Sequence, residues 1–238
     1  FSYILSLNTI ADNIGTEYSV SDSKRFYNEL NENNLEDICI KRVLELRSNK
    51  TIKSQKLSVF FEPQLACDFI EYIANSLTGN IIEKKISFLS DKIGKNIGND
   101  NFSLFDDGTI DYKTGSLPFD AEANLISAKT IIDNGNIITP FTDTKTSKKL
   151  GIKNTNNATL DSYQSTFDID YHNLLMKAGT YNRDDIISNI DKGLYLYSFS
   201  DSGGVDLISG NFSVEAKGIL IEKGKLTKAL NHLTLASN

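Results

Sequence analysis

Imidazoles and thiols, the side chains best suited to binding zinc and to acid–base or nucleophilic chemistry near neutral pH, are rare in this sequence. The only imidazoles are those of His172 and His232, and the only thiols are those of Cys39 and Cys67. A zinc site or a cysteine–histidine pair needs several such groups close together, and here they are scattered along the sequence. We therefore interpret both histidines as structural residues with satisfied hydrogen bonds, and both cysteines as reduced thiols packed in the core.

Glu71 is a carboxylate whose place in a helix can be predicted from periodicity. It lies in a predicted amphipathic helix that begins at Pro63, carries apolar residues at helical spacing and is expected to end at Gly79. A general base and a glutamate on the solvated face of a helix are both compatible with this position. The second situation is the more common one.

The composition excludes two classes of partner. The chain has 238 residues, enough for a substantial core, and a formal net charge of −6 with its basic residues scattered. Without a basic stripe there is no surface for a phosphate backbone, so nucleic acid is not an expected partner. No apolar run approaches the roughly 20 residues that cross a bilayer, so we expect no membrane partner. Two reduced cysteines are typical of a cytoplasmic protein.

The elements that would position these groups show both strand and helix periodicity. An N-terminal hairpin over residues 2–10 and 17–20 is expected to join the main sheet. Asn134–Gly135 is the strongest short hairpin signal, because both residues accept positive φ. The other predicted elements are a helix over 34–47, strands over 57–61, 169–176 and 194–199, and a helix over 183–191.

A glycine-rich stretch near the C-terminus predicts short antiparallel strands joined by tight turns. Apolar residues alternate over 212–221, and the segment 222–225 interrupts them with a glycine, which indicates a hairpin. Gly203, Gly204 and Gly210 lack the strand–helix context and spacing of a dinucleotide-binding loop. They are interpreted as turn or close-approach positions.

Several sequence blocks occur in an order that resembles the TldD/PmbA family. The blocks are SFLSDKIG at 87–94, LPFDAE at 117–122, TSKKLG at 146–151, GNFS at 210–213, GILIEKGKL at 218–226 and LTLASN at 233–238. Ala123, after the second block, stands where the family usually has glycine. Each block is weak alone, but the ordered set extends the resemblance over most of residues 57–238.

The resemblance implies the fold class. It is an α+β architecture: a large, mostly antiparallel, barrel-like β domain with two or three short helices, formed by residues 1–238 as a single domain. The resemblance also implies that an N-terminal α/β region and the extreme C-terminus of a TldD/PmbA-like protein lie outside this chain.

The family also implies where a metal would bind. In TldD-type subunits a helix carries the motif H-E-x-x-x-H, and a thiolate from the C-terminal region completes a zinc site in which the glutamate activates water. The resemblance places the histidine positions on Ile70 and Asn75 and the glutamate position on Glu71, and no cysteine follows Cys67. Ile70 has no donor atom, and an amide is a poor ligand for zinc. We therefore expect no cofactor in this chain, and zinc only in a TldD-type partner.

The resemblance further implies that the glycine-rich stretch borders a substrate cleft lined by Gly203, Gly204, Gly210, Asn211 and Phe212. The expected function is that of a non-catalytic PmbA/TldE-type subunit, which forms part of the chamber of a cytosolic zinc metallopeptidase acting on unfolded peptides. Its expected partner is a TldD-like subunit or a second copy of the chain. Two alternatives remain open: a metal-independent hydrolase that uses Glu71, and a protein-binding scaffold, including the family's older description as a modulator of DNA gyrase.

Overall fold

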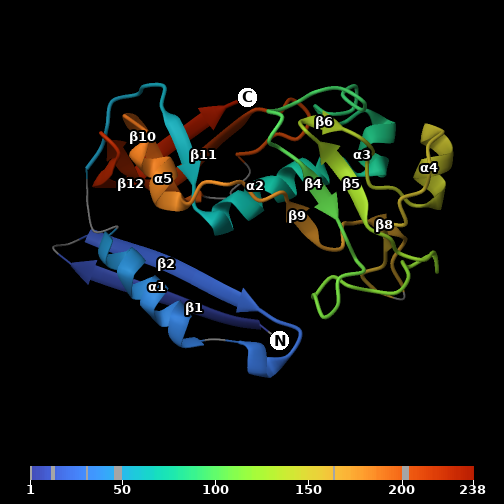
Figure 1. Ribbon diagram of the computed structural model, residues 1–238, viewed down its shortest axis with the longest axis horizontal. Coiled ribbons are helices and arrows are strands. Elements are labelled where there is room, and N and C mark those ends of the chain that lie inside the picture. The colour runs from blue at the N-terminus through green and yellow to red at the C-terminus, as the bar shows by residue number, and fades with distance from the viewer. Residues whose placement is uncertain (1, 12–13, 31, 46–49, 163, 200–203) are drawn as a thin grey trace. The chain divides into compact units, whose positions relative to one another are not determined.

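The structure is a computed structural model that describes residues 2–11, 14–30, 32–45, 50–162, 164–199 and 204–238 (Figure 1). The chain divides into two compact units. Unit 1 comprises residues 1–69, 180–206 and 211–238, and unit 2 comprises residues 70–179 and 207–210. The boundary falls inside one helix, α2 (Pro63–Asn75), so each unit is described by itself below.

The N-terminal part of unit 1 is a hairpin packed against a helix. β1 (Ser2–Ala11) and β2 (Ile14–Ser23) pair antiparallel, and a 3-10 turn, η1 (Tyr27–Glu29), precedes α1 (Glu32–Glu45). The predicted hairpin is therefore confirmed, and so is the predicted helix over residues 34–45; residues 46–47 of that prediction lie outside the described residues. The expectation that the hairpin joins the main sheet is wrong, because in the described residues β1 and β2 form a two-stranded sheet of their own.

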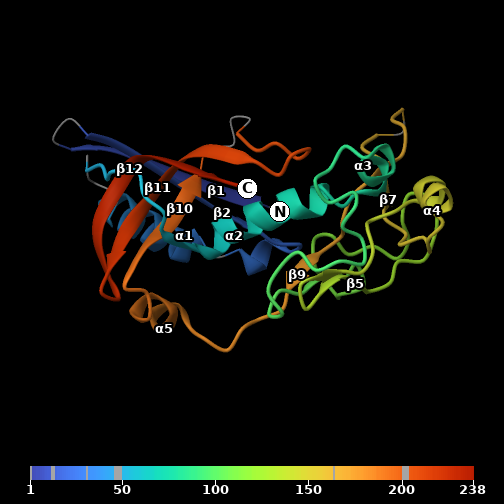
Figure 2. The ribbon, with the colours of Figure 1, turned by 90° about the horizontal axis from the view of Figure 1, so that it is seen from above.

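A four-stranded sheet forms the centre of unit 1, in the order β12–β11–β10–β3. Its strands are β3 (Ser58–Phe61), β10 (Lys192–Phe199), β11 (Phe212–Glu222) and β12 (Lys225–Ser237). Figure 2 shows β12, β11 and β10 side by side. β10 runs antiparallel to β11 and parallel to β3.

The hairpin between β11 and β12 confirms the prediction for the C-terminal stretch. Lys223 and Gly224 take φ values of 52° and 72°, as a tight hairpin turn requires. The short strands predicted for this stretch are instead one long strand, β11, and Gly218 lies within it. A Cβ at this position would stand 2.5 Å from the carbonyl oxygen of Tyr195 on the neighbouring strand, so the glycine permits the close approach of the two strands.

The two faces of this sheet are both apolar, because successive side chains point to opposite sides. On one face Tyr195, Tyr197 and Ile221 pack with Ile187 of α5 (Arg183–Ser188). On the other face the core comprises Leu65, Leu194, Leu196, Ala216, Leu220 and Leu230. The sheet therefore forms the middle layer of unit 1.

Arg42 connects α1 to this sheet. Its guanidinium pairs with the buried carboxylate of Glu62 and lies 4.6 Å from the ring centroid of Tyr197. A planar guanidinium is well suited to make both contacts at once, because it can pair with a carboxylate through its edge and stack on a ring through its face. The attachment thus depends on the geometry of arginine as well as on its charge.

Unit 2 contains a second four-stranded sheet, in the order β6–β5–β4–β9, and a two-stranded sheet of β7 and β8. The strands are β4 (Leu104–Asp106), β5 (Lys129–Asp133), β6 (Asn136–Ile137), β7 (Ala158–Thr159), β8 (Asp168–Ile169) and β9 (Leu174–Met176). The helices are the end of α2, α3 (Gly79–Lys84) and α4 (Thr144–Leu150). Asn134 and Gly135, with φ of 46° and 77°, form the predicted turn between β5 and β6.

Two sequence predictions in unit 2 are wrong for identifiable reasons. Gly79 begins α3, whereas α2 already ends at Asn75. A Cβ on Gly79 would lie 2.7 Å from Thr146 Oγ1, so the glycine is needed for packing and not as a helix terminator. The predicted strand 169–176 is split, because the backbone N–H groups of His172 and Asn173 donate to the carboxylate of Asp106 and not to a sheet ladder.

The α+β class and the mostly antiparallel pairing are confirmed. The described residues contain five α-helices, where two or three were expected, and their strands form four sheets.

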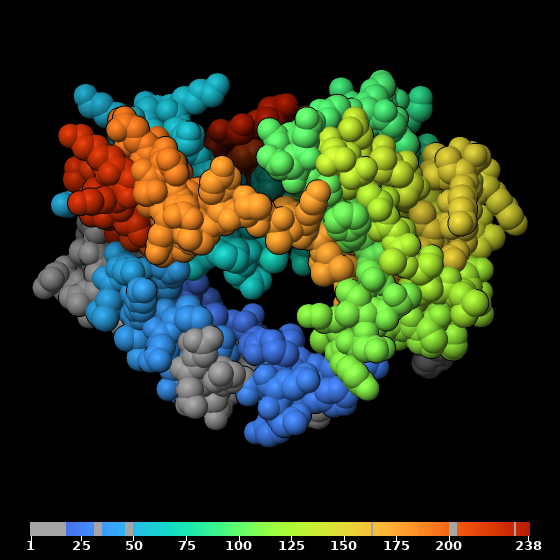
Figure 3. Space-filling model, in the orientation of Figure 1, coloured from blue at the N-terminus to red at the C-terminus, as the bar shows by residue number. Residues whose placement is uncertain are grey.

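No helix among the described residues is long and apolar enough to cross a bilayer. Figure 3 shows the loop that precedes β5 in green to yellow-green at the surface; Leu117, Phe119 and Leu125 of this loop are 54%, 56% and 76% exposed.

Candidate functional site

Glu71 lies on an exposed part of α2, where Tyr171 is its neighbour. The helix forms because Pro63 fits its first turn and apolar residues recur along one face. Burial and the nearby Glu71 carboxylate, which accepts a hydrogen bond from the phenol, raise the pKa of Tyr171 above its usual value. The phenol therefore stays protonated at neutral pH and donates to Glu71. The carboxylate is oriented by this contact.

Ile70 and Asn75 occupy the positions where the family resemblance places histidines. Their side chains do not converge on a common point as metal ligands do. Ile70 is half-buried and packs against the core of unit 2, and Asn75 is exposed. Catalytic zinc usually takes three protein ligands from His, Cys, Asp or Glu. In the part of the chain that the structure describes, no group of three or more such side chains is arranged to hold a metal ion. The side chains around Glu71 do not fit a zinc ion.

The two histidines have separate roles in separate units. In unit 2, Nδ1 of His172 lies 3.1 Å from Asp106 Oδ2 inside a buried network. In unit 1, Nδ1 of the exposed His232 lies 3.0 Å from Glu215 Oε1 across β11 and β12. Both histidines therefore have the satisfied hydrogen bonds that were predicted.

The cysteines differ from each other. Cys39 is buried in α1, and its thiol donates to the carbonyl oxygen of Tyr18 over 3.3 Å. Cys67 is a reduced cysteine on an exposed part of α2, so the expectation that it packs in the core is wrong. The helical spacing identified the helix correctly but did not show that this turn faces solvent.

Unit 1 contains an open groove of about 890 Å³ on the face of its sheet that carries Leu194 and Leu230. One wall is the segment 51–57 and the other is the C-terminal half of β12. Its charged lining residues are Lys53 and Lys56, together with the titratable His232. The groove is therefore apolar at its base and basic along one wall.

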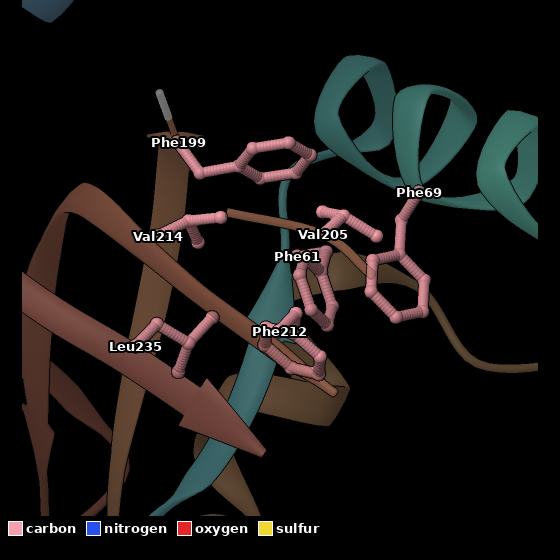
Figure 4. Close-up of a pocket in the computed structure, with 7 residues that line it drawn as sticks. All are labelled: Phe61, Phe69, Phe199, Val205, Phe212, Val214 and Leu235. Atoms are coloured by element: carbon pink, nitrogen blue, oxygen red, sulfur yellow. The ribbon is translucent and has the colours of Figure 1, made fainter. Parts of the chain in front are cut away.

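An aromatic cluster forms part of the lining of this groove. The rings of Phe61 and Phe69 stack with centroids 5.3 Å apart, and Phe69 and Phe212 meet edge to face at 5.8 Å. Figure 4 shows these rings around a small cavity, which Val205 and Leu235 also line. The cavity has only about 10 Å³, room for one water molecule at most. The aromatic side chains of the cluster are therefore tightly packed.

The expected cleft residues fall into two groups. Phe212 lines the groove. Gly204 and Asn211 belong to the turn that leads into β11: Gly204 accepts a backbone hydrogen bond from Ser213, and Asn211 Oδ1 accepts one from Asn238 Nδ2. Gly210, in unit 2, takes a φ of 78°. Gly203 lies outside the described residues.

A buried polar network in unit 2 was not predicted. The side chain of Asp106 is 0% exposed and accepts hydrogen bonds from Lys129, Asn157 and His172. Burial opposes its ionisation, but these donors outweigh burial and lower the pKa of Asp106 to about 2. The only sequence signal was an acidic residue at the end of a short apolar run, which is too common to be diagnostic.

Comparison with known proteins places these features in a family. Residues 54–238 match the family model described as the PmbA/TldA metallopeptidase C-terminal domain. A metalloprotease TldD homologue from Buchnera aphidicola is 32% identical over 69% of this chain and 34% of its own length. A metalloprotease PmbA homologue from Haemophilus influenzae is 25% identical over 98% of this chain and 50% of its own length. The chain thus spans about a third to a half of these relatives.

Solved structures show the same fold. A proposed modulator of a DNA gyrase from Thermotoga maritima superimposes with a TM-score of 0.90 at 24% identity, covering 100% of this chain and 54% of the other. TldE from Thermococcus kodakarensis superimposes with a TM-score of 0.89 at 20% identity, again covering 100% of this chain and 54% of the other. At these identities the likeness concerns the fold.

Proposed function

The chain belongs to the PmbA/TldD metallopeptidase family, and we propose that it is the C-terminal region of a PmbA/TldE-type subunit without metal chemistry of its own. In this proposal it pairs in the cytoplasm with a TldD-type, zinc-bearing subunit, or with a second copy of itself. Its sheet would form part of the wall of the chamber in which an unfolded peptide is cut.

One observation carries the proposal: the positions on α2 that would hold zinc are occupied by Ile70 and Asn75. Ile70 supplies packing to the core of unit 2, and Asn75 supplies only a neutral amide. The glutamate between them contacts a protonated tyrosine. These residues support a subunit without metal chemistry of its own, since neither Ile70 nor Asn75 is a usual zinc ligand.

The groove in unit 1 supports the peptide-binding part of the proposal. Its apolar base suits an extended chain, whose alternate side chains would enter the groove. Phe212 is the expected cleft residue that lines it. The identities do not assign the subunit type, since both TldD and PmbA homologues match this chain.

The test measures zinc and peptidase activity in the same preparation. Purified protein should contain far less than one zinc per chain by mass spectrometry of the metal, and should not cut casein or short peptides. Activity should appear after a TldD-type subunit is added, and chelation should remove it. Glu71→Gln in this chain should leave that activity unchanged.

Two results would overturn the proposal. Zinc bound tightly at one ion per chain would contradict the absence of a metal site. Activity of the isolated chain that Glu71→Gln abolishes would instead support the metal-independent hydrolase. Capture of an unrelated protein, without any complex with a TldD-type subunit, would favour a scaffold.

A further inference from the structure

Three polar side chains meet in the interior of unit 2. Asp106 comes from β4, Lys129 from β5, and Asn157 from the residue that precedes β7. The side chains of Lys129 and Asp106 are 10% and 0% exposed, and Asn157 is 1% exposed. Asp106 and Lys129 are direct partners in the register of β4 and β5, so the sheet fixes the carboxylate and the amine opposite each other.

The distances bring an amine, a carboxamide and a proton acceptor together. Nζ of Lys129 lies 3.1 Å from Oδ1 of Asn157 and 3.1 Å from Oδ2 of Asp106. The same Asp106 oxygen accepts from Nδ2 of Asn157 over 2.9 Å. One carboxylate oxygen therefore touches both groups that would exchange protons if the amine attacked the amide.

We propose that Lys129 and Asn157 react with each other to form an intramolecular amide bond, with Asp106 transferring the proton. This inference is independent of the proposed peptidase role. It assigns a covalent cross-link to unit 2 that joins β5 to the segment before β7.

The reaction balances without a cofactor. Asp106 takes a proton from the Lys129 ammonium, and the neutral amine adds to Cγ of Asn157. The proton on Asp106 then passes to the Asn157 nitrogen, the Cγ–Nδ2 bond breaks, and ammonia leaves. A second proton lost from the new amide nitrogen converts the departing ammonia to ammonium. The product is one secondary amide whose N–H faces the regenerated carboxylate.

The surroundings favour each step. Burial lowers the pKa of Lys129, which makes the neutral, nucleophilic amine more accessible than it is in water. Asp106 is ionised at neutral pH, so it can act first as the base. Nδ1 of His172 lies 3.3 Å from Nδ2 of Asn157 and can share the proton that the leaving group needs. Exclusion of water limits the competing hydrolysis of the amide.

The alternative is that these residues form only an ion pair and hydrogen bonds, and the mass of the protein distinguishes the two cases. Intact mass spectrometry of the denatured protein should give a mass one ammonia molecule below that of the sequence. After trypsin digestion, cleavage at Lys129 should be missing, and the peptides that contain Lys129 and Asn157 should be recovered as one linked species.

Variants separate the cross-link from general damage to the fold. Lys129→Arg keeps the positive charge but removes the nucleophile, and Asp106→Asn removes the base, so both should show the full mass. Lys149→Arg, at an exposed ion pair with Glu83, should retain the loss of ammonia. A folded wild-type protein of full mass, with normal cleavage at Lys129, would overturn the proposal whatever the variants show.

Discussion

The carboxylate of Asp106 accepts a hydrogen bond from the backbone N–H of His172 over 2.8 Å, and its other oxygen lies 3.1 Å from Nδ1 of the same histidine. Asp106 therefore contacts both the main chain and the side chain of His172, which is 66 positions away in sequence. This relationship ties the short strand β4 to the segment between β8 and β9.

Substitution of Asp106 should strongly destabilise unit 2. Asp106→Ala removes the acceptor that the buried nitrogens of Lys129 and Asn157 share, and breaking a buried polar network of this kind typically costs about 3–5 kcal/mol of unfolding free energy. Urea denaturation followed by circular dichroism measures the loss. Lys149→Ala is the matched control, because solvent screens an exposed ion pair and leaves it with little effect on stability. An equal effect of the two variants would contradict the assigned role of the network.

The stability of unit 2 should fall at acid pH because of the same group. The pKa of Asp106 is about 2 in the folded protein, below its ordinary value of 3.8. A lowered pKa gives stability that is fully present above pH 4, amounts to about 2 kcal/mol, and is lost as the pH falls from about 4 to 2. Urea midpoints measured across this range should show the loss, and Asp106→Asn should flatten it.

Glu71 should influence the titration of Tyr171. Burial is the larger cause of the raised tyrosine pKa, and the negative charge of Glu71 adds to it. Glu71→Gln should therefore lower the pKa of Tyr171 without restoring its usual value. Carbon NMR of labelled tyrosine, assigned with Tyr171→Phe, follows the change. An unchanged titration would show that the two side chains do not interact in solution.

Gly79→Ala should destabilise the protein by about 1–3 kcal/mol, the usual range for overpacking. The new Cβ would lie 2.7 Å from Thr146 Oγ1 and 2.9 Å from the carbonyl oxygen of Phe141. Gly179→Ala provides the control, since nothing lies within 4 Å of a Cβ there. Thermal unfolding of the two variants compares them directly, and a neutral Gly79→Ala would be inconsistent with this packing.

Ala123→Gly should stabilise the protein. Ala123 takes a φ of 63°, in the left-handed region that costs a residue with a Cβ about 1 kcal/mol. Glycine also raises the conformational entropy of the unfolded chain, which offsets part of this relief. We therefore expect the unfolding free energy to rise by roughly 0.5–1 kcal/mol. Ala128→Gly, where φ is not positive, should instead lose a similar amount. Urea midpoints for the pair provide the measurement.

Local patterns predicted the elements whose cause is local. The Asn134–Gly135 turn, the Lys223–Gly224 hairpin and the helix that begins at Pro63 depend on φ preferences and on periodicity, which are visible in the sequence. The family resemblance identified residues 117–122 as one of its blocks, with Ala123 at a usual glycine position, but gave no structural reason for the block. The structure gives the reason: Asp120 Oδ1 accepts the backbone N–H groups of Glu122 and Asn124, and Ala123 takes the strained conformation.

Long-range contacts account for what could not be predicted. The strand expected over 169–176 is interrupted because Asp106, far away in sequence, accepts its backbone donors. Gly79 has the appearance of a helix terminator, and its actual neighbours Phe141 and Thr146 cannot be inferred from local periodicity. The same limit applies to the candidate site, because nothing near Glu71 in sequence indicates Tyr171 as its partner.

The backbone N–H of Thr144 donates a hydrogen bond of 2.9 Å to Oε2 of Glu122. This bond links the first turn of α4 to the surface loop that carries Phe119 and Leu125. A ligand or subunit that bound the exposed apolar side chains of that loop would displace the Glu122 carboxylate. The hydrogen bond to the first turn of the helix would then change. Amide exchange at Thr144 would then report, from inside the fold, on an event at its surface.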